Sequence, residues 1–147
     1  MKEVVVVKQF GILAVLLAFL VVLPAVHADE WNQATLITFS QPVQIPGRVL
    51  PAGTYLFELV NNYNHEIVRI SNADRSNVIA LVQAIPAKQA GFSGNGAVIL
   101  AQRGESKPEA VVAWSYPGQL QGHQFLYEKR VQSELARDKK ETIAVGD

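Results

Sequence analysis

Short runs of β-branched, aromatic and alternating apolar residues recur along this sequence, and clusters of turn-forming residues separate them. Gly, Pro, Asn, Asp and Ser bound strands because they favour turns. The runs are residues 34–40, 54–60, 66–71, 78–86, 97–102, 109–117 and 123–128. They predict an all-β fold, either a single antiparallel β-sandwich of about seven or eight short strands or a sheet closed on itself. We take the β-sandwich as the fold class.

Two of the runs carry a more specific pattern. Residues 54–60 alternate, with Tyr55 and Phe57 on one face. Residues 78–86 are apolar on both faces, which predicts a central strand buried on both sides. Between the runs, the turn at residues 72–77 should be held by an aspartate or asparagine side chain that bonds its own backbone.

The stretch IPGRVLPAGT, residues 45–54, contains two turn signals in succession. Pro46-Gly47 fits the central positions of a type II turn, where glycine adopts a positive φ without strain. Pro51 and Gly53 predict a second corner before the next strand. A phosphate-binding loop would be followed by a helix, whereas here a strand follows. We therefore interpret the stretch as a tight double corner that serves as scaffold.

The N-terminal residues 1–28 have the organisation of a secretory signal peptide. A weakly basic start precedes an uncharged, mostly apolar stretch over residues 9–26. Val26 and Ala28 occupy positions −3 and −1 of a cut between Ala28 and Asp29. The apolar core is short for a membrane span, which needs about 20 residues. The alternative is an uncleaved N-terminal anchor.

Export to the periplasm or the extracellular space follows from this interpretation, and residues 29–147 are long enough for one domain with a hydrophobic core. The full sequence has no Cys, so disulfides and thiolate metal sites are excluded. Lys plus Arg equals Asp plus Glu, 13 each, so no basic field is available for nucleic acid. We expect no cofactor, and no membrane association of the mature form.

The C-terminal residues 129–147 differ from the rest in their density of charge. From Glu128 to about Thr142 the composition favours helix. Its apolar stripe is narrow and rests mainly on Val131 and Leu135, which holds a helix weakly. We expect a solvated, partly frayed helix after a domain at 29–128. A tail that binds a partner is the alternative.

Several sequence blocks resemble a family of small exported bacterial proteins of unknown function. They are LPAGTY at 50–55, NAD at 72–74 before a strand that ends in IP, AWSYPG at 113–118 and GHQFLYEK at 122–129. The resemblance spans about residues 34–130. It implies an exported all-β domain, and it assigns no role to any residue.

A search for catalytic or metal-binding motifs finds none with the required spacing. His65 and His123 are the histidines after residue 28, and His65-Glu66 lacks the second His of a helical zinc motif. No serine stands in a nucleophile elbow. An enzyme would need a cleft that brings one of these histidines to a carboxylate. We therefore predict a protein that is not an enzyme and has no metal site.

Aromatic residues are the remaining candidates for ligand binding. Trp114 and Tyr116 share one strand face, and Tyr63 and Phe92 fall in turns where we expect exposure. Exposed rings on a sheet could stack on sugars or peptides, whereas rings turned inward would form the core. We favour the core for the strand aromatics, and keep these four residues as candidate ligand contacts.

The predicted function is an exported, non-catalytic module that binds a protein partner or packs into the cell envelope. A small carbohydrate-binding module that uses the strand aromatics is the alternative. The two differ in whether Trp114 and Tyr116 lie on an open face or inside the domain.

Overall fold

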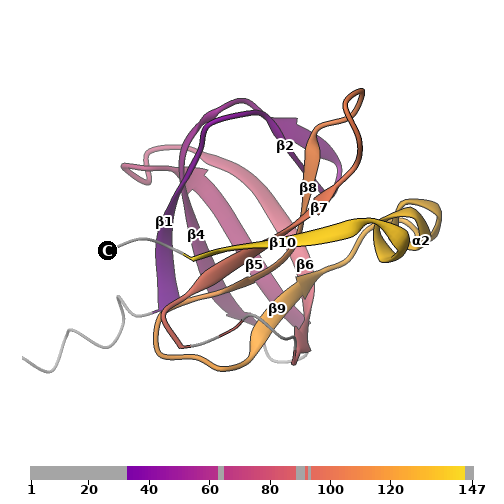
Figure 1. Cartoon of the computed structure of the whole chain (residues 1–147). Coiled ribbons are helices and arrows are strands. Elements are labelled where there is room, and N and C mark those ends of the chain that lie inside the picture. The colour runs from indigo at the N-terminus through magenta and orange to yellow at the C-terminus, as the bar shows by residue number, and fades with distance from the viewer. Residues whose placement is uncertain (1–32, 63–64, 89–91, 93, 145–147) are drawn as a thin grey trace, which may run out of the picture. The chain divides into compact units, whose positions relative to one another are not determined.

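The computed structural model describes residues 33–62, 65–88, 92 and 94–144. These residues form mostly β structure with one short helix (Figure 1). The elements are β1 Ala34–Phe39, β2 Val43–Ile45, β3 Arg48–Leu50, β4 Gly53–Asn62, β5 His65–Asn72, β6 Val78–Ala87, β7 Ala97–Gln102, β8 Glu109–Ser115, β9 Gly122–Phe125, α2 Lys129–Arg137 and β10 Lys139–Ala144.

All the strands belong to one 10-stranded sheet with the order β1-β4-β5-β6-β9-β8-β2-β3. Strand β7 also pairs with β8, and β10 pairs with β7. Every pairing is antiparallel except β2 with β8. The sequence predicted a sandwich of two sheets, whereas here β9 joins β6 to β8 and so links all the strands. In this order β1 and β10 each pair along one edge.

Each of the seven runs predicted from the sequence is a strand, with ends that differ by no more than a few residues. The prediction for residues 78–86 was wrong in one respect. Strand β6 is central, but Leu81 and Ile85 on its outer face are exposed, by 64% and 44%. Its apolar outer face therefore lacks a covering layer among the described residues.

The double corner at residues 45–54 contains a small hairpin that the sequence did not reveal. Pro46-Gly47 joins β2 to β3, and Gly47 has a φ of 85°, as a type II turn requires. Gly53 begins β4 with a positive φ of 158°, near the extended limit. The hairpin turns three apolar side chains into the core, those of Val43, Ile45 and Leu50.

The turn between β5 and β6 has the side-chain bonds predicted for it. Asp74 Oδ1 accepts from the backbone N–H of Ser76 at 3.0 Å, and Asn72 Oδ1 accepts from that of Asn77 at 2.9 Å. The Ser76 hydroxyl and N–H hold the pKa of Asp74 below its ordinary value.

The main core lies on the inner face of the sheet, and aromatic rings dominate it. Phe57 on β4 is fully buried, and its ring centroid lies 6.0 Å from that of Trp114 on β8 and 6.1 Å from that of Phe125 on β9. Three strands separate β4 from β8 in the sheet order. The sheet must therefore curl until its two halves face each other, as Figure 1 shows.

A second apolar cluster lies on the outer face of β7 and β8, where helix α2 covers the sheet. Leu135 of the helix is buried, with 3% exposed, and Val131 packs beside it. The facing strand residues are small or β-branched, which lets the helix approach closely. They are Ala97, Ile99, Ala101, Ala110, Val112 and Ala113.

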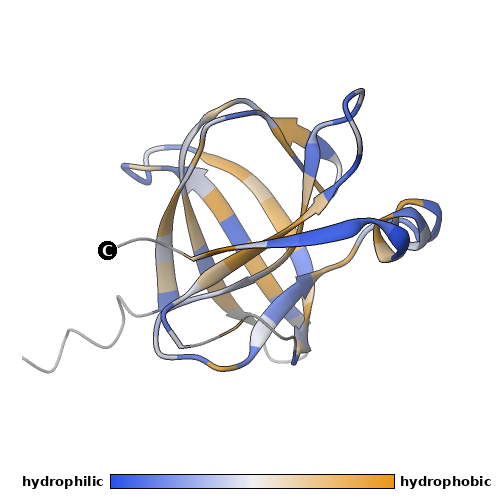
Figure 2. Cartoon of the chain, in the orientation of Figure 1, coloured by the Kyte–Doolittle hydropathy of each residue, from blue (hydrophilic) through white to orange (hydrophobic). Residues whose placement is uncertain are grey.

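The expectation of a C-terminal helix is confirmed, but its solvated character and its extent to about Thr142 were wrong. Helix α2 ends at Arg137, and residues 139–144 form strand β10, paired with β7 from Lys139↔Gln102 to Ala144↔Ala97. The ammonium of Lys140 donates to the carbonyls of Leu135 and Asp138, which lie at the C-terminal end of the helix. Figure 2 shows β10 crossing the sheet as a largely hydrophilic strand. Among the described residues, no helix has the length and apolar character needed to cross a bilayer.

Phe92 was predicted to be exposed, and it is buried, with 9% of its surface accessible. Its ring lies directly over Gly122 at the start of β9, in the space that a side chain at position 122 would take. Glycine at this position thus creates the site for the ring in the second apolar cluster.

We predict that Gly122→Ala lowers the free energy of unfolding by about 2–4 kcal/mol, because the added Cβ displaces a buried phenyl ring. The single variant Phe92→Ala should cost a similar amount. In that background Gly122→Ala should be nearly neutral. Chemical denaturation of the three variants measures this, and equal costs of Gly122→Ala in both backgrounds would contradict the packing described.

Candidate functional site

The four aromatic candidates differ in what the structure shows of them. Trp114 is fully buried, and Tyr116 is 8% exposed. Phe92 is buried against Gly122. Tyr63 lies outside the described residues, as does the predicted cleavage position between residues 28 and 29. The strand aromatics therefore form the core, as we favoured, and offer no open ring face for stacking.

Trp114 and Tyr116 lie beside a histidine–carboxylate pair that the sequence analysis did not assemble. His123 Nδ1 lies 2.6 Å from Glu66 Oε2, and the imidazole is 7% exposed. The ring stacks on Tyr116 at 5.8 Å and lies 5.6 Å from the Trp114 ring. His123 is on β9 and Glu66 on β5, and β6 runs between these strands.

Tyr116, whose ring stacks on His123, has a pKa that its surroundings change. Burial, and to a lesser extent the charge of Glu66, raises the pKa of Tyr116. The indole N–H of Trp114 has no hydrogen-bond partner among the described residues. Glu66 is 29% exposed at its side chain and so can be solvated. The pair gives one nitrogen of a buried imidazole a partner and links β9 to β5 across β6.

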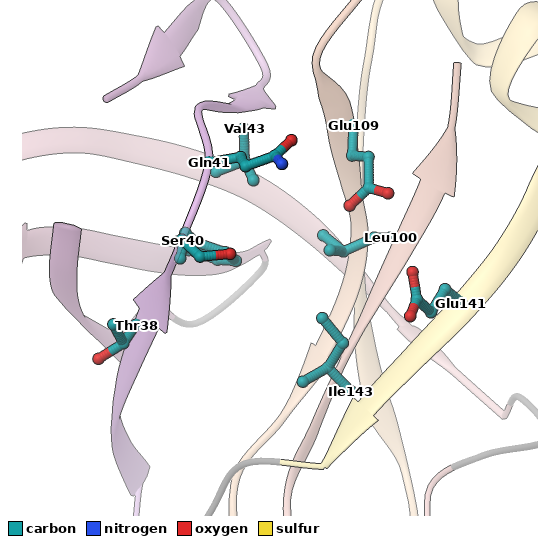
Figure 3. A pocket seen from close by; sticks show the side chains of 9 residues that line it. Thr38, Ser40, Gln41, Val43, Leu100, Glu109, Glu141 and Ile143 are labelled. Atoms are coloured by element: carbon teal, nitrogen blue, oxygen red, sulfur yellow. The ribbon is translucent and has the colours of Figure 1, made fainter. Parts of the chain in front are cut away.

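A groove of about 260 Å³ lies between the β1–β2 segment and strands β7, β8 and β10. Figure 3 shows polar residues of the β1–β2 segment on one side and two glutamates on the other. One wall has Thr38, Ser40 and Gln41, the other has Glu109, Glu141 and Ile143, and the floor has Phe39, Val43 and Leu100.

The floor of this β1–β10 groove belongs to the main core. Phe39, Val43 and Leu100 are 5%, 3% and 2% exposed and pack in the same cluster as Phe57. In the strand ladders, Glu109 lies opposite Val43 and Glu141 lies opposite Leu100. Because side chains directly opposite each other share a face of a sheet, both glutamates lie on the inner face.

A second cavity, of about 240 Å³, lies beside α2 and is filled with compensating charges. The buried Arg103 guanidinium donates to Glu134 at 2.6 Å and to Gln44, and so ties the helix to β2. Lys107, and then the hydrogen bond from Arg130, lower the pKa of Glu134. Nearby, burial raises the pKa of Tyr127 well above its usual range. The charged residues around this cavity therefore pair with one another and hold the helix against the sheet.

Comparisons with known proteins found no matching family model, no matching curated protein and no matching solved structure.

We predict that Glu66 and His123 are coupled in stability. Glu66→Ala removes the partner of a buried imidazole nitrogen and should cost about 1–3 kcal/mol in the free energy of unfolding. His123→Phe keeps a ring against Trp114 and Tyr116. The double variant should lose at least about 1 kcal/mol less than the sum of the single losses. Additive losses in chemical denaturation would show that the contact contributes nothing.

Proposed function

We propose that this chain is an exported, non-catalytic interaction module, and that the β1–β10 groove binds an extended segment of a partner protein. The observation that carries the proposal is the position of the groove. It opens where the curled sheet ends, between β1 and β10, which each have one edge that no described strand pairs with. Its floor is the hydrophobic core.

An extended polypeptide could bind in this groove, because its backbone can pair with an open strand edge. β1 pairs with β4 along one edge, and among the described strands nothing pairs with its other edge. Leu36 on this strand is a large apolar residue and is 54% exposed. A segment laid beside β1 would pair its backbone and cover Leu36.

The inner face of β10 also supports binding of a segment in the groove. Glu141 and Ile143 lie on the face that is buried elsewhere in the sheet, yet both are exposed, Ile143 by 44%. Their ladder partners Leu100 and Val98 are buried in the main core. Glu141 and Ile143 are therefore open to a ligand on the inner face, and a bound segment would cover Ile143.

Carbohydrate binding through the strand aromatics has less support. Stacking on a sugar needs an accessible ring face, and Trp114 and Tyr116 are buried.

The export part of the proposal depends on the sequence of residues 1–28, with its apolar stretch and small residues at −3 and −1. The description of the fold as a sandwich depends on the two facing halves of the curled sheet.

A selection from a phage-displayed library of random linear peptides tests this function. We expect peptides that shift the NMR amide signals of β1, of residues 40–43 and of β10. Ser40→Trp, which fills the groove from an exposed position, should abolish their binding.

Gln119→Trp is the matched control. It adds the same ring to an exposed loop at the opposite end of β8 from Glu109, and it should leave binding unchanged. Recovery of no binding peptide, or binding that Ser40→Trp leaves intact, would contradict the proposal.

A further inference from the structure

We infer that the β1–β10 groove selects a segment that has a lysine or arginine and an apolar residue two positions apart. This inference rests on the proposed function and gives its ligand a chemical class. Two observations carry it, namely the two glutamates on the groove wall and the alternation of side chains along β10.

Glu109 and Glu141 reach the groove from different strands. Figure 3 shows both carboxyl groups turned toward Leu100 on the groove floor. Two carboxylates that line one groove give it negative charge and several hydrogen-bond acceptors. The charge of the groove therefore complements a basic side chain.

Neither carboxylate has an ion-pair partner among the described residues, although basic residues are available elsewhere. Glu58 pairs with Arg69 at 2.7 Å, and Glu134 pairs with Arg103 at 2.6 Å. Within the part of the chain that the structure describes, the one hydrogen bond to either groove carboxylate is donated by the Gln102 amide to Glu141, at 3.2 Å. The groove glutamates thus keep acceptor capacity for a ligand.

Protection of an open edge by inward-pointing charge is the simplest alternative explanation for Glu141. It does not account for Glu109, which is the first residue of β8, in the interior of the sheet order. Val111, two residues further along β8, is fully buried in the main core. A carboxylate at this inner position could pair with a basic side chain of the bound segment.

Strand geometry fixes the spacing of the ligand. Glu141 and Ile143 are two residues apart on the inner face of β10, so a polar and an apolar contact alternate along the groove wall. A bound strand also repeats its facing side chains every two residues. A basic residue at one position and an apolar residue two positions away would match this wall.

Matched synthetic peptides test the inference. The probe is acetyl-Thr-Thr-Lys-Thr-Leu-Thr-amide, and its counterpart has norleucine in place of lysine, which keeps the aliphatic chain and removes the charge. Measured by NMR titration at low salt, the lysine peptide should bind the intact domain about 10-fold more tightly. The preference should shrink as salt is raised.

The double variant Glu109→Gln, Glu141→Gln should abolish this preference and leave the affinity for the norleucine peptide unchanged. Glu105→Gln, a change of the same charge in the turn between β7 and β8, should preserve the preference. These two results together would support the basic-residue selection.

The failures are distinguishable. Equal affinity of the two peptides for the wild-type groove, or a lysine preference that survives in the double variant, would overturn the charge selection and leave the groove as a binding site. If neither peptide shifts the groove signals and the library selection also yields none, both the selection and the proposed function are wrong.

Discussion

The contact between the two halves of the sheet, made through Phe57, is the constraint on which the rest of the structure depends. A sheet of this many strands has far more apolar surface on one face than a single helix can cover. The sheet solves this by curling, so that β4 meets β8 and β9 through the rings of Phe57, Trp114 and Phe125. Helix α2 covers part of the outer face, over β7 and β8.

Curling of the sheet also determines where the molecule stays open. The end strands β1 and β10 approach the same part of the core without pairing with each other, and the groove lies between them. The inner-face positions of β10 are therefore exposed, although they match buried positions on β7. The proposed binding of an extended segment is a consequence of this incomplete closure of the sheet.

The amino-acid sequence predicts the long strands well, because alternation and turn residues are local signals. It fails for β2 and β3, which have three residues each and owe their pairing to the Pro46-Gly47 turn and to β8. It also fails for β10, whose charged residues resemble a solvated helix and become a strand through pairing with β7. The groove and the Glu66–His123 contact depend on which strands become neighbours, and no local pattern of these residues encodes that.

Nuclear Overhauser effects between ring protons of Phe57 and Trp114 are the most direct test of the curled sheet. The two rings belong to strands that three others separate in the sheet, so their proximity can arise only if the sheet folds back on itself. We predict clear cross-peaks between these rings, and between Phe57 and Phe125, together with the antiparallel contacts along β4, β5 and β6. Intact strand contacts without any cross-peak between Phe57 and Trp114 would contradict the structure and, with it, the groove.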